Sequence, residues 1–213
     1  LRNKIIPILQ NVILGKHLKK IESDIEKAIP NENFNGLAII DYEKWRPLYE
    51  HNWSSKRIYR KESIAYVKKR NSRIDEKTAE SIAKDEFNNA SMEFLIQTIR
   101  KAKTMRPKAF WGYYGMPFCN YTAGTNGTIA CGEVYENFND RLLSLYIEST
   151  ALYPSIYLPN RESNVTGCLY VISVLQEAKR CAAKLMSKVP IYTFTAIEYF
   201  PLKPDDPYYT RVN

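Results

Sequence analysis

Amphipathic helical stretches alternate with short, unbroken apolar runs, and this alternation limits the folds open to the chain. Apolar residues recur at helical spacing in three long segments: 14–28, 79–102 and 165–185. Asp75 is a candidate N-cap of the second segment, and Pro107 marks its end. Residues 63–69 and 140–148 are predicted to form shorter helical segments. Four apolar runs have the length and composition of strands: 36–40, 109–114, 151–158 and 191–199. Continuous apolar runs are typical of parallel strands that are covered on both faces. The alternation therefore predicts an α/β fold of βαβ units with right-handed crossovers.

The length of the chain sets the expected architecture. A closed (β/α) barrel usually takes about 250 residues and eight strands. This chain has 213 residues and only four predicted strands. We therefore expect a TIM-like (β/α) barrel that is incomplete in this chain, with residues 1–213 forming one segment of a single domain.

Polar side chains gather at the predicted ends of these strands. Asp41 and Glu43 end the first strand, Tyr114 ends the second, and Ser155 and Tyr157 lie near the end of the third. Reactive groups of (β/α) barrels lie at the carboxyl ends of the strands. Carboxylates at i and i+2 of a strand share one face about 7 Å apart, which favours retention of a proton on one of them. The alternative is a strand end whose acids are simply solvated.

The cysteines and glycosylation sequons favour an extracellular setting. Cys119 and Cys131 bracket a loop rich in Asn, Thr and Gly, which is typical of a disulfide-closed surface loop. Cys168 and Cys181 lie in one predicted helix, too far apart to pair, and are expected to be small buried residues or free thiols. Five Asn-x-Ser/Thr sequons are glycosylation candidates: Asn52, Asn89, Asn120, Asn126 and Asn164.

The charge balance indicates a polyanionic partner. The formal net charge is +8, which suits nucleic acid, anionic lipid or an acidic polysaccharide. No recognition-helix or zinc-finger pattern supports nucleic acid, and no apolar run reaches the length of a membrane span. His17 and His51 are isolated in the sequence, so no metal site and no cofactor is expected.

Four sequence blocks resemble the hyaluronidases of glycoside hydrolase family 56. They are Gly36–Pro47, Asn52–Trp53, Trp111–Tyr114 and Glu148–Tyr157. The blocks occur in the family's order and spacing, and the resemblance covers nearly the whole chain. The family's first strands and its C-terminal part have no counterpart here.

The resemblance implies roles for three residues in catalysis. Glu43 matches the general acid/base, and Asp41 matches the carboxylate that orients the substrate's acetamido group. Tyr157 matches a tyrosine near that group. The nucleophile would be the substrate's own acetamido oxygen, so a single proton-donating carboxyl suffices.

Further positions match substrate-binding and structural residues of the family. Tyr114 matches a residue lining the sugar cleft, and Ser155 and Arg46 match supporting polar positions. Cys119 and Cys131 match a family disulfide. One departure stands out, because Val174 occupies the position of an arginine that the family usually carries.

The implied function is endo-acting hydrolysis of β-1,4 linkages between N-acetylhexosamine and glucuronate. Hyaluronan is the expected substrate and partner, with chondroitin as a second candidate, and the expected location is extracellular. A non-catalytic or impaired hyaluronan-binding homologue is the alternative, because Val174 replaces the arginine.

Overall fold

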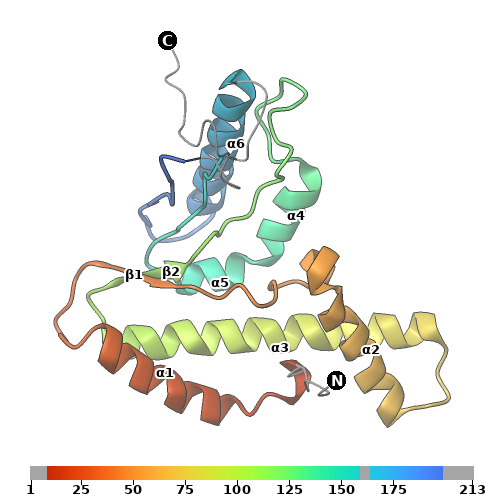
Figure 1. The fold of residues 1–213 in the computed structure, drawn as a ribbon. Helices are drawn as coiled ribbons and strands as arrows, with labels where there is room; N and C mark the ends of the chain where they lie inside the picture. Colours follow the sequence, from red (N-terminus) through yellow and green to blue (C-terminus); the bar gives the residue numbers. More distant parts are fainter. Residues whose placement is uncertain (1–8, 159–163, 199–213) are drawn as a thin grey trace. The chain divides into compact units, whose positions relative to one another are not determined.

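The chain forms two compact units in the computed structural model, which describes residues 9–158 and 164–198 (Figure 1). The first unit comprises Leu1–Asn35 and Tyr42–Lys108, and the second comprises Gly36–Asp41 and Ala109–Asn213. One of the boundaries between the units lies directly after Asp41.

Three helices make up most of the first unit. Helices α1 (Leu14–Ala28) and α2 (Arg57–Arg70) both pack against α3 (Glu76–Met105), which runs the length of this unit in Figure 1. The core face of α3 is fully buried at Ala79, Ala83, Phe87, Leu95, Ile99 and Ala102. The described residues of this unit also form three short 3₁₀ turns: η1 (Leu9–Asn11), η2 (Tyr49–His51) and η3 (Ser54–Lys56).

The ends of α3 confirm the sequence prediction. Asp75 caps the N-terminus, since its Oδ1 accepts a hydrogen bond from the Thr78 amide at 2.9 Å. The helix ends at Met105, and Arg106 leaves the helical conformation immediately before Pro107.

Helix α2 begins before the predicted helix over 63–69. The prediction missed its first turns because they carry no apolar stripe. They are held by polar contacts instead. The Arg60 guanidinium lies 4.9 Å from the ring centre of Tyr49 and 3.1 Å from the Glu80 carboxylate.

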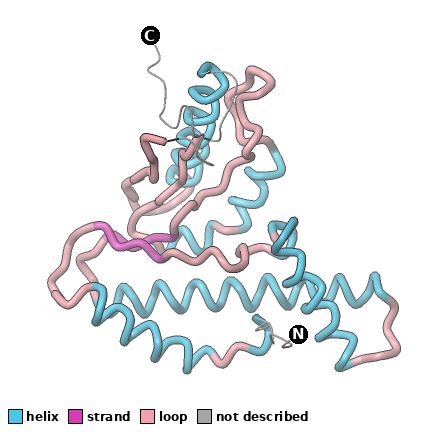
Figure 2. Tube along the Cα trace, in the orientation of Figure 1, coloured by secondary structure: helices cyan, strands magenta, loops and turns pink. Residues whose placement is uncertain are grey.

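The second unit is built on two parallel strands, shown in magenta in Figure 2. Strand β1 (Leu37–Ile40) pairs with β2 (Phe110–Tyr113), with Leu37 opposite Phe110 and Ile40 opposite Tyr113. Gly112 is required in β2, because a Cβ there would lie 2.3 Å from the carbonyl oxygen of Ala151. In the part of this unit that the structure describes, three helices accompany the strands: α4 (Glu133–Arg141), α5 (Leu143–Glu148) and α6 (Asn164–Ala183).

The predicted third and fourth strands form only isolated bridges. Leu152 pairs with Ile191 and Ser155 with Phe194, both in parallel, and Tyr199 lies outside the described residues. A parallel ladder would have residue 154 donate to the carbonyl of residue 192, but Pro154 has no N–H. Hydrogen bonds on either side of Pro154 persist at 2.9–3.0 Å.

The predicted helical segment over 140–148 is two helices. The Leu142 N–H is shared between the carbonyls of Phe138 and Asn139, and α4 gives way to α5 at this fully buried residue. Among the helices of the described part of the chain, none combines the length and apolar composition of a membrane span.

Candidate functional site

The predicted catalytic carboxylates follow the carboxyl end of β1. The strand ends at Ile40, and both Asp41 and Glu43 are exposed residues of the loop behind it. The expectation that they end the strand itself is therefore wrong, and the alternating-face argument does not apply to them. Asp41 belongs to the second unit and Glu43 to the first.

In the second unit, Tyr114 lies at the carboxyl end of β2, next to the end of β1. Its backbone N–H donates to the carbonyl of Ile40 at 3.1 Å, which extends the strand pairing by one bond. Its half-buried ring packs edge-on against Phe194, with ring centres 4.8 Å apart. Tyr114 is therefore fixed beside the peptide that leads into Asp41.

The segment carrying Ser155 and Tyr157 lies beside the end of β2. Tyr153 pairs with Tyr114, and the Gly115 N–H donates to the Tyr153 carbonyl at 2.8 Å. The rings of Tyr114 and Tyr157 are 6.5 Å apart, centre to centre. The structure thus brings Tyr114 and Tyr157 together, both half-buried, with Ser155 on the same segment.

In the first unit, Arg46 is held by the side chain of Asn52. The Arg46 N–H donates to Asn52 Oδ1 at 2.8 Å, and Asn52 Nδ2 donates back to the Arg46 carbonyl at 2.9 Å. The Arg46 guanidinium donates to the His51 carbonyl at 3.1 Å and lies 4.7 Å from the ring centre of Trp53. The loop after Glu43 is therefore ordered around a fully buried amide.

Lys56 is a residue of this loop that sequence reasoning missed. Its ammonium group donates to the main-chain carbonyls of Glu43 and Lys44. Burial and the nearby positive charge of Arg46 lower the Lys56 pKa, while the negative charge of Glu43 opposes them. Lys56 thus binds the backbone at Glu43, and no local sequence pattern predicts this contact.

Comparison with known proteins identifies the family of the chain. The family model described as hyaluronidase matches residues 3–203. The chain belongs to the hyaluronidase family, glycoside hydrolase family 56. This confirms the resemblance carried by the four sequence blocks.

Relatives in this family include enzymes named for two polysaccharides. The chain is 38% identical over 202 residues to a chondroitin hydrolase of Caenorhabditis elegans, covering 94% of this chain and 44% of the relative. It is 39% identical over 198 residues to human hyaluronidase PH-20, covering 90% and 38% of the two chains. It thus spans less than half the length of these relatives.

A solved hyaluronidase has a similar fold. The crystal structure of bee venom hyaluronidase in complex with a hyaluronic acid tetramer matches with a TM-score of 0.86 and 29% identity. The match covers 94% of this chain and 61% of the venom enzyme.

Val174, where the resemblance implies an arginine, is a core residue. It is 2% exposed and clusters with Ala123 and Tyr170, and Ile156 and Leu158 pack against the same cluster. These last two residues flank Tyr157 in the sequence. The position expected to hold an arginine therefore contributes apolar packing to the segment that bears Tyr157.

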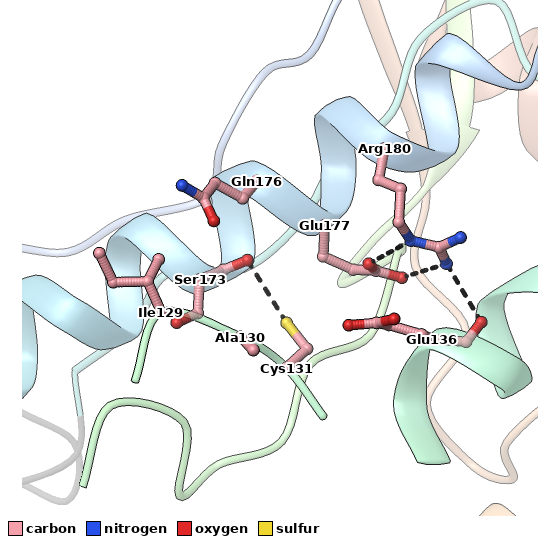
Figure 3. Close-up of a pocket in the computed structure, with 8 residues that line it drawn as sticks. All are labelled: Ile129, Ala130, Cys131, Glu136, Ser173, Gln176, Glu177 and Arg180. Atoms are coloured by element: carbon pink, nitrogen blue, oxygen red, sulfur yellow. Dashed lines mark hydrogen bonds and ion pairs between the residues drawn. The ribbon is translucent and has the colours of Figure 1, made fainter. Parts of the chain in front are cut away.

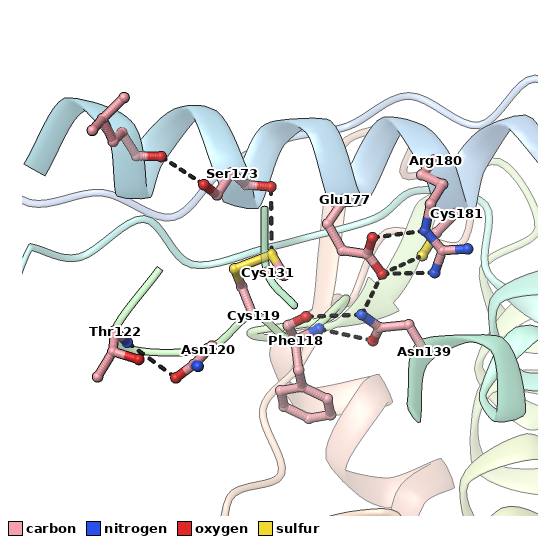
Figure 4. The surroundings of a disulfide bond; sticks show 11 residues. Phe118, Cys119, Asn120, Thr122, Cys131, Asn139, Ser173, Glu177, Arg180 and Cys181 are labelled. Carbon is pink, nitrogen blue, oxygen red and sulfur yellow. Dashed lines mark hydrogen bonds and ion pairs between the residues drawn. A yellow bond between two sulfur atoms is a disulfide. The ribbon is translucent and has the colours of Figure 1, made fainter. Parts of the chain in front are cut away.

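The predicted disulfide between Cys119 and Cys131 is confirmed, with the two Cα atoms 4.9 Å apart (Figure 4). Cys168 is a free exposed thiol and Cys181 a free buried one. Both outcomes lie within the alternatives left open for this pair.

A pocket of about 220 Å³ lies beside the disulfide, within the second unit (Figure 3). Its lining is Ile129, Ala130, Cys131, Glu136, Ser173, Gln176, Glu177 and Arg180. Arg180 donates to the Glu177 carboxylate at 2.7 Å and 2.8 Å and to the Glu136 carbonyl at 3.1 Å. The pocket contains none of the predicted catalytic or substrate-binding residues, and its Arg180 guanidinium and Glu177 carboxylate already bind each other.

Proposed function

We propose that the chain carries the catalytic carboxylates of an endo-acting hyaluronidase. The bond cleaved is the β-1,4 linkage between N-acetylhexosamine and glucuronate in hyaluronan, with chondroitin as a second substrate. The carrying observation is the placement of Asp41 and Glu43 directly after parallel strand β1, in a chain matched by the hyaluronidase family model over residues 3–203. In the whole protein, the parallel segments would belong to a TIM-like (β/α) barrel, and residues 1–213 to its catalytic domain.

The proposed reaction begins with proton donation by Glu43 to the glycosidic oxygen. The acetamido carbonyl oxygen of the substrate attacks the anomeric carbon as the leaving sugar departs. Asp41 stabilises the positive charge that develops on the acetamido nitrogen. Glu43 then removes a proton from the water that opens the intermediate, so the anomeric configuration is retained.

Aromatic and basic groups support the binding half of the proposal. Tyr114 and Tyr157 offer neighbouring ring faces for a sugar, and the Tyr157 hydroxyl would donate toward the acetamido group. Ser155 and Arg46 would supply further polar contacts. A chain with formal charge +8 attracts a polymer that carries one carboxylate per repeating unit.

Two relatives point to the substrate class. One has been crystallised with a hyaluronic acid tetramer, and another is named a chondroitin hydrolase. We assign this chain the same class of anionic polysaccharide, and an extracellular location follows from that substrate.

The second candidate function is hyaluronan binding without cleavage. The observation that favours it is Val174, which is buried among apolar neighbours where the family usually has an arginine. If that arginine is needed for catalysis, this chain binds the polymer and leaves it intact.

Polymer size separates the two candidates. The protein, expressed at the full length its gene encodes, is incubated with high-molecular-mass hyaluronan and, in parallel, with chondroitin. Product size is read on a substrate gel, and binding is read by co-sedimentation. Shortened hyaluronan supports the hydrolase, whereas retention without shortening supports the binding protein. If the protein neither retains nor shortens either polymer, both candidate functions are overturned.

A further inference from the structure

We propose that the disulfide-closed loop between Cys119 and Cys131 is a glycan-bearing surface, with Asn126 and Asn120 as its N-glycan acceptors. Asn52 and Asn89 carry the same sequence motif and stay unmodified in the folded protein. The assignment comes from the different surroundings of these four side chains. Glycan attachment here requires no hydrolase activity of the chain.

The loop is anchored at its base and exposed at its tip. The disulfide closes it, and Ala123 is buried against the cluster of Tyr170 and Val174 on α6. Gly124 adopts φ +84° at a point where a Cβ would lie 2.7 Å from that of Leu169, so only glycine fits this close approach. The following residues, 125–130, are all exposed.

Asn126 has the geometry of an acceptor. The Thr128 hydroxyl donates to Asn126 Oδ1 at 2.6 Å, and the Thr128 N–H donates to the same oxygen at 3.2 Å. Both bonds polarise the carboxamide from its oxygen side. Within the described residues, Nδ2 of this exposed side chain makes no hydrogen bond.

Asn120 is arranged in a similar way at the start of the loop. Its Oδ1 accepts a hydrogen bond from the Thr122 N–H at 3.1 Å, drawn as a dashed line in Figure 4. Asn120 is half-buried, while Tyr121 and Thr122 are exposed. A glycan on Nδ2 can therefore leave the surface without displacing the loop.

The reaction needs a donor of known chemical class, an oligosaccharide linked to a lipid diphosphate. A bond forms between Asn Nδ2 and the anomeric carbon of the first N-acetylglucosamine. The bond from that carbon to the phosphate oxygen breaks, Nδ2 loses one proton, and the lipid diphosphate departs. Exposed Nδ2 and a hydroxyl two residues later are the features that this transfer requires of the acceptor.

Asn52 cannot carry a glycan in this fold. Its side chain is 0% exposed, and both Nδ2 hydrogens are donated, to the carbonyls of Arg46 and Leu48 at 2.9 Å. A glycan would remove one of these donors and would have no path to solvent. Glycosylation at Asn52 is therefore incompatible with the folded loop.

The third residue of the Asn89 sequon, Ser91, is inaccessible in the folded protein. Asn89 lies within α3, and Ser91 is fully buried with its hydroxyl donated to the Pro47 carbonyl. The hydroxyl that the transfer requires is thus packed inside the first unit.

The test is site mapping on the protein secreted from a eukaryotic cell culture. Peptides are treated with a peptide-N-glycosidase in heavy-oxygen water, which labels each formerly glycosylated asparagine as aspartate. A non-reducing peptide map shows the disulfide between Cys119 and Cys131, which verifies passage through an oxidising compartment. We expect the label at Asn126 and Asn120, and none at Asn52 or Asn89.

Three variants remove sequons without altering the asparagines. Thr128→Ala and Thr122→Ala should each reduce, by one glycan, the mass that the protein loses on peptide-N-glycosidase treatment. Ser54→Ala, at an exposed residue, is the matched control, because it removes the Asn52 sequon. It should leave the mass of released glycan unchanged. Label at Asn52 or Asn89 in folded protein, or an unlabelled Asn126 and Asn120 in protein with the disulfide formed, would overturn the proposal.

Discussion

Asn139 donates a hydrogen bond of 2.7 Å from Nδ2 to the carboxylate of Glu177, and both side chains are buried between α4 and α6. The same amide accepts from the Phe118 N–H at 3.0 Å and donates to the Phe118 carbonyl at 2.8 Å (Figure 4). Glu177 in turn binds Arg180. One buried amide therefore links two helices to the residue that precedes the disulfide.

Replacing Asn139 should destabilise the protein strongly. Asn139→Ala leaves polar groups of Phe118 and Glu177 without their partner, and each such group costs about 1–3 kcal/mol. We expect the free energy of unfolding, measured by urea denaturation, to fall by about 2 kcal/mol or more. Asn137→Ala is the control, because Asn137 is exposed on the same helix. Equal effects of the two substitutions would contradict the structural role of Asn139.

Asn52 should matter to the first unit in the same way. Asn52→Ala removes three hydrogen bonds to the backbone of Arg46 and Leu48, and the expected loss of stability is about 2 kcal/mol. Asn89→Ala, at an exposed position of α3, should stay within about 0.5 kcal/mol of wild type. A thermal melt of both variants checks this, and a stable Asn52→Ala variant would refute the account of the loop.

The buried position of Val174 predicts the outcome of introducing the arginine that the family resemblance implies there. Val174→Arg places a charge among Ala123, Tyr170 and the residues packed on them, and an uncompensated buried charge costs on the order of 3 kcal/mol. We expect a lower unfolding midpoint, with Val174→Leu closer to wild type. A fully stable Val174→Arg variant with increased hydrolysis would show instead that the site accommodates the arginine.

His17 should make the docking of α1 sensitive to acid. Its ring stacks on Phe94 with centres 3.9 Å apart, and its Nε2 lies 2.7 Å from the Thr98 hydroxyl. Burial lowers the His17 pKa below 6.5, although Asp24 opposes the shift. The folded chain then binds fewer protons than the unfolded one, so the stabilisation is present above pH 6.5 and is lost as the pH falls through the folded-state pKa.

The variant His17→Gln isolates this effect, because glutamine can bind Thr98 but does not titrate. Urea denaturation of both proteins at pH 7.5 and pH 5.5 gives the comparison. Wild type should lose more stability than His17→Gln on acidification. Parallel losses would exclude His17 as the source.

Local patterns in the sequence predicted the elements whose apolar spacing repeats within one segment. Helices α1 and α3, the cap at Asp75 and strands β1 and β2 are of this kind, because their periodicity and capping chemistry depend on near neighbours. The disulfide pair was also predictable, since its cysteines bracket a polar loop.

Other features depend on contacts between distant segments and left no local signal. Pro154 interrupts a ladder whose partner strand lies some forty residues later, so its effect follows only from the pairing register. Asn52 looked like a glycosylation sequon, and Lys56 looked like an ordinary surface lysine. Their roles follow from backbone groups that only the folded loop brings within reach.

The central claim is that Glu43 is the proton donor in hyaluronan cleavage, and the rate of reducing-end formation by Glu43→Gln tests it most directly. Glu32→Gln, at an exposed residue ahead of β1, is the matched control. We expect Glu43→Gln to lower the rate by at least about 100-fold, as loss of a general acid does, with an unchanged unfolding midpoint. Glu32→Gln should retain the wild-type rate. Full activity in a folded Glu43→Gln variant would contradict the assignment.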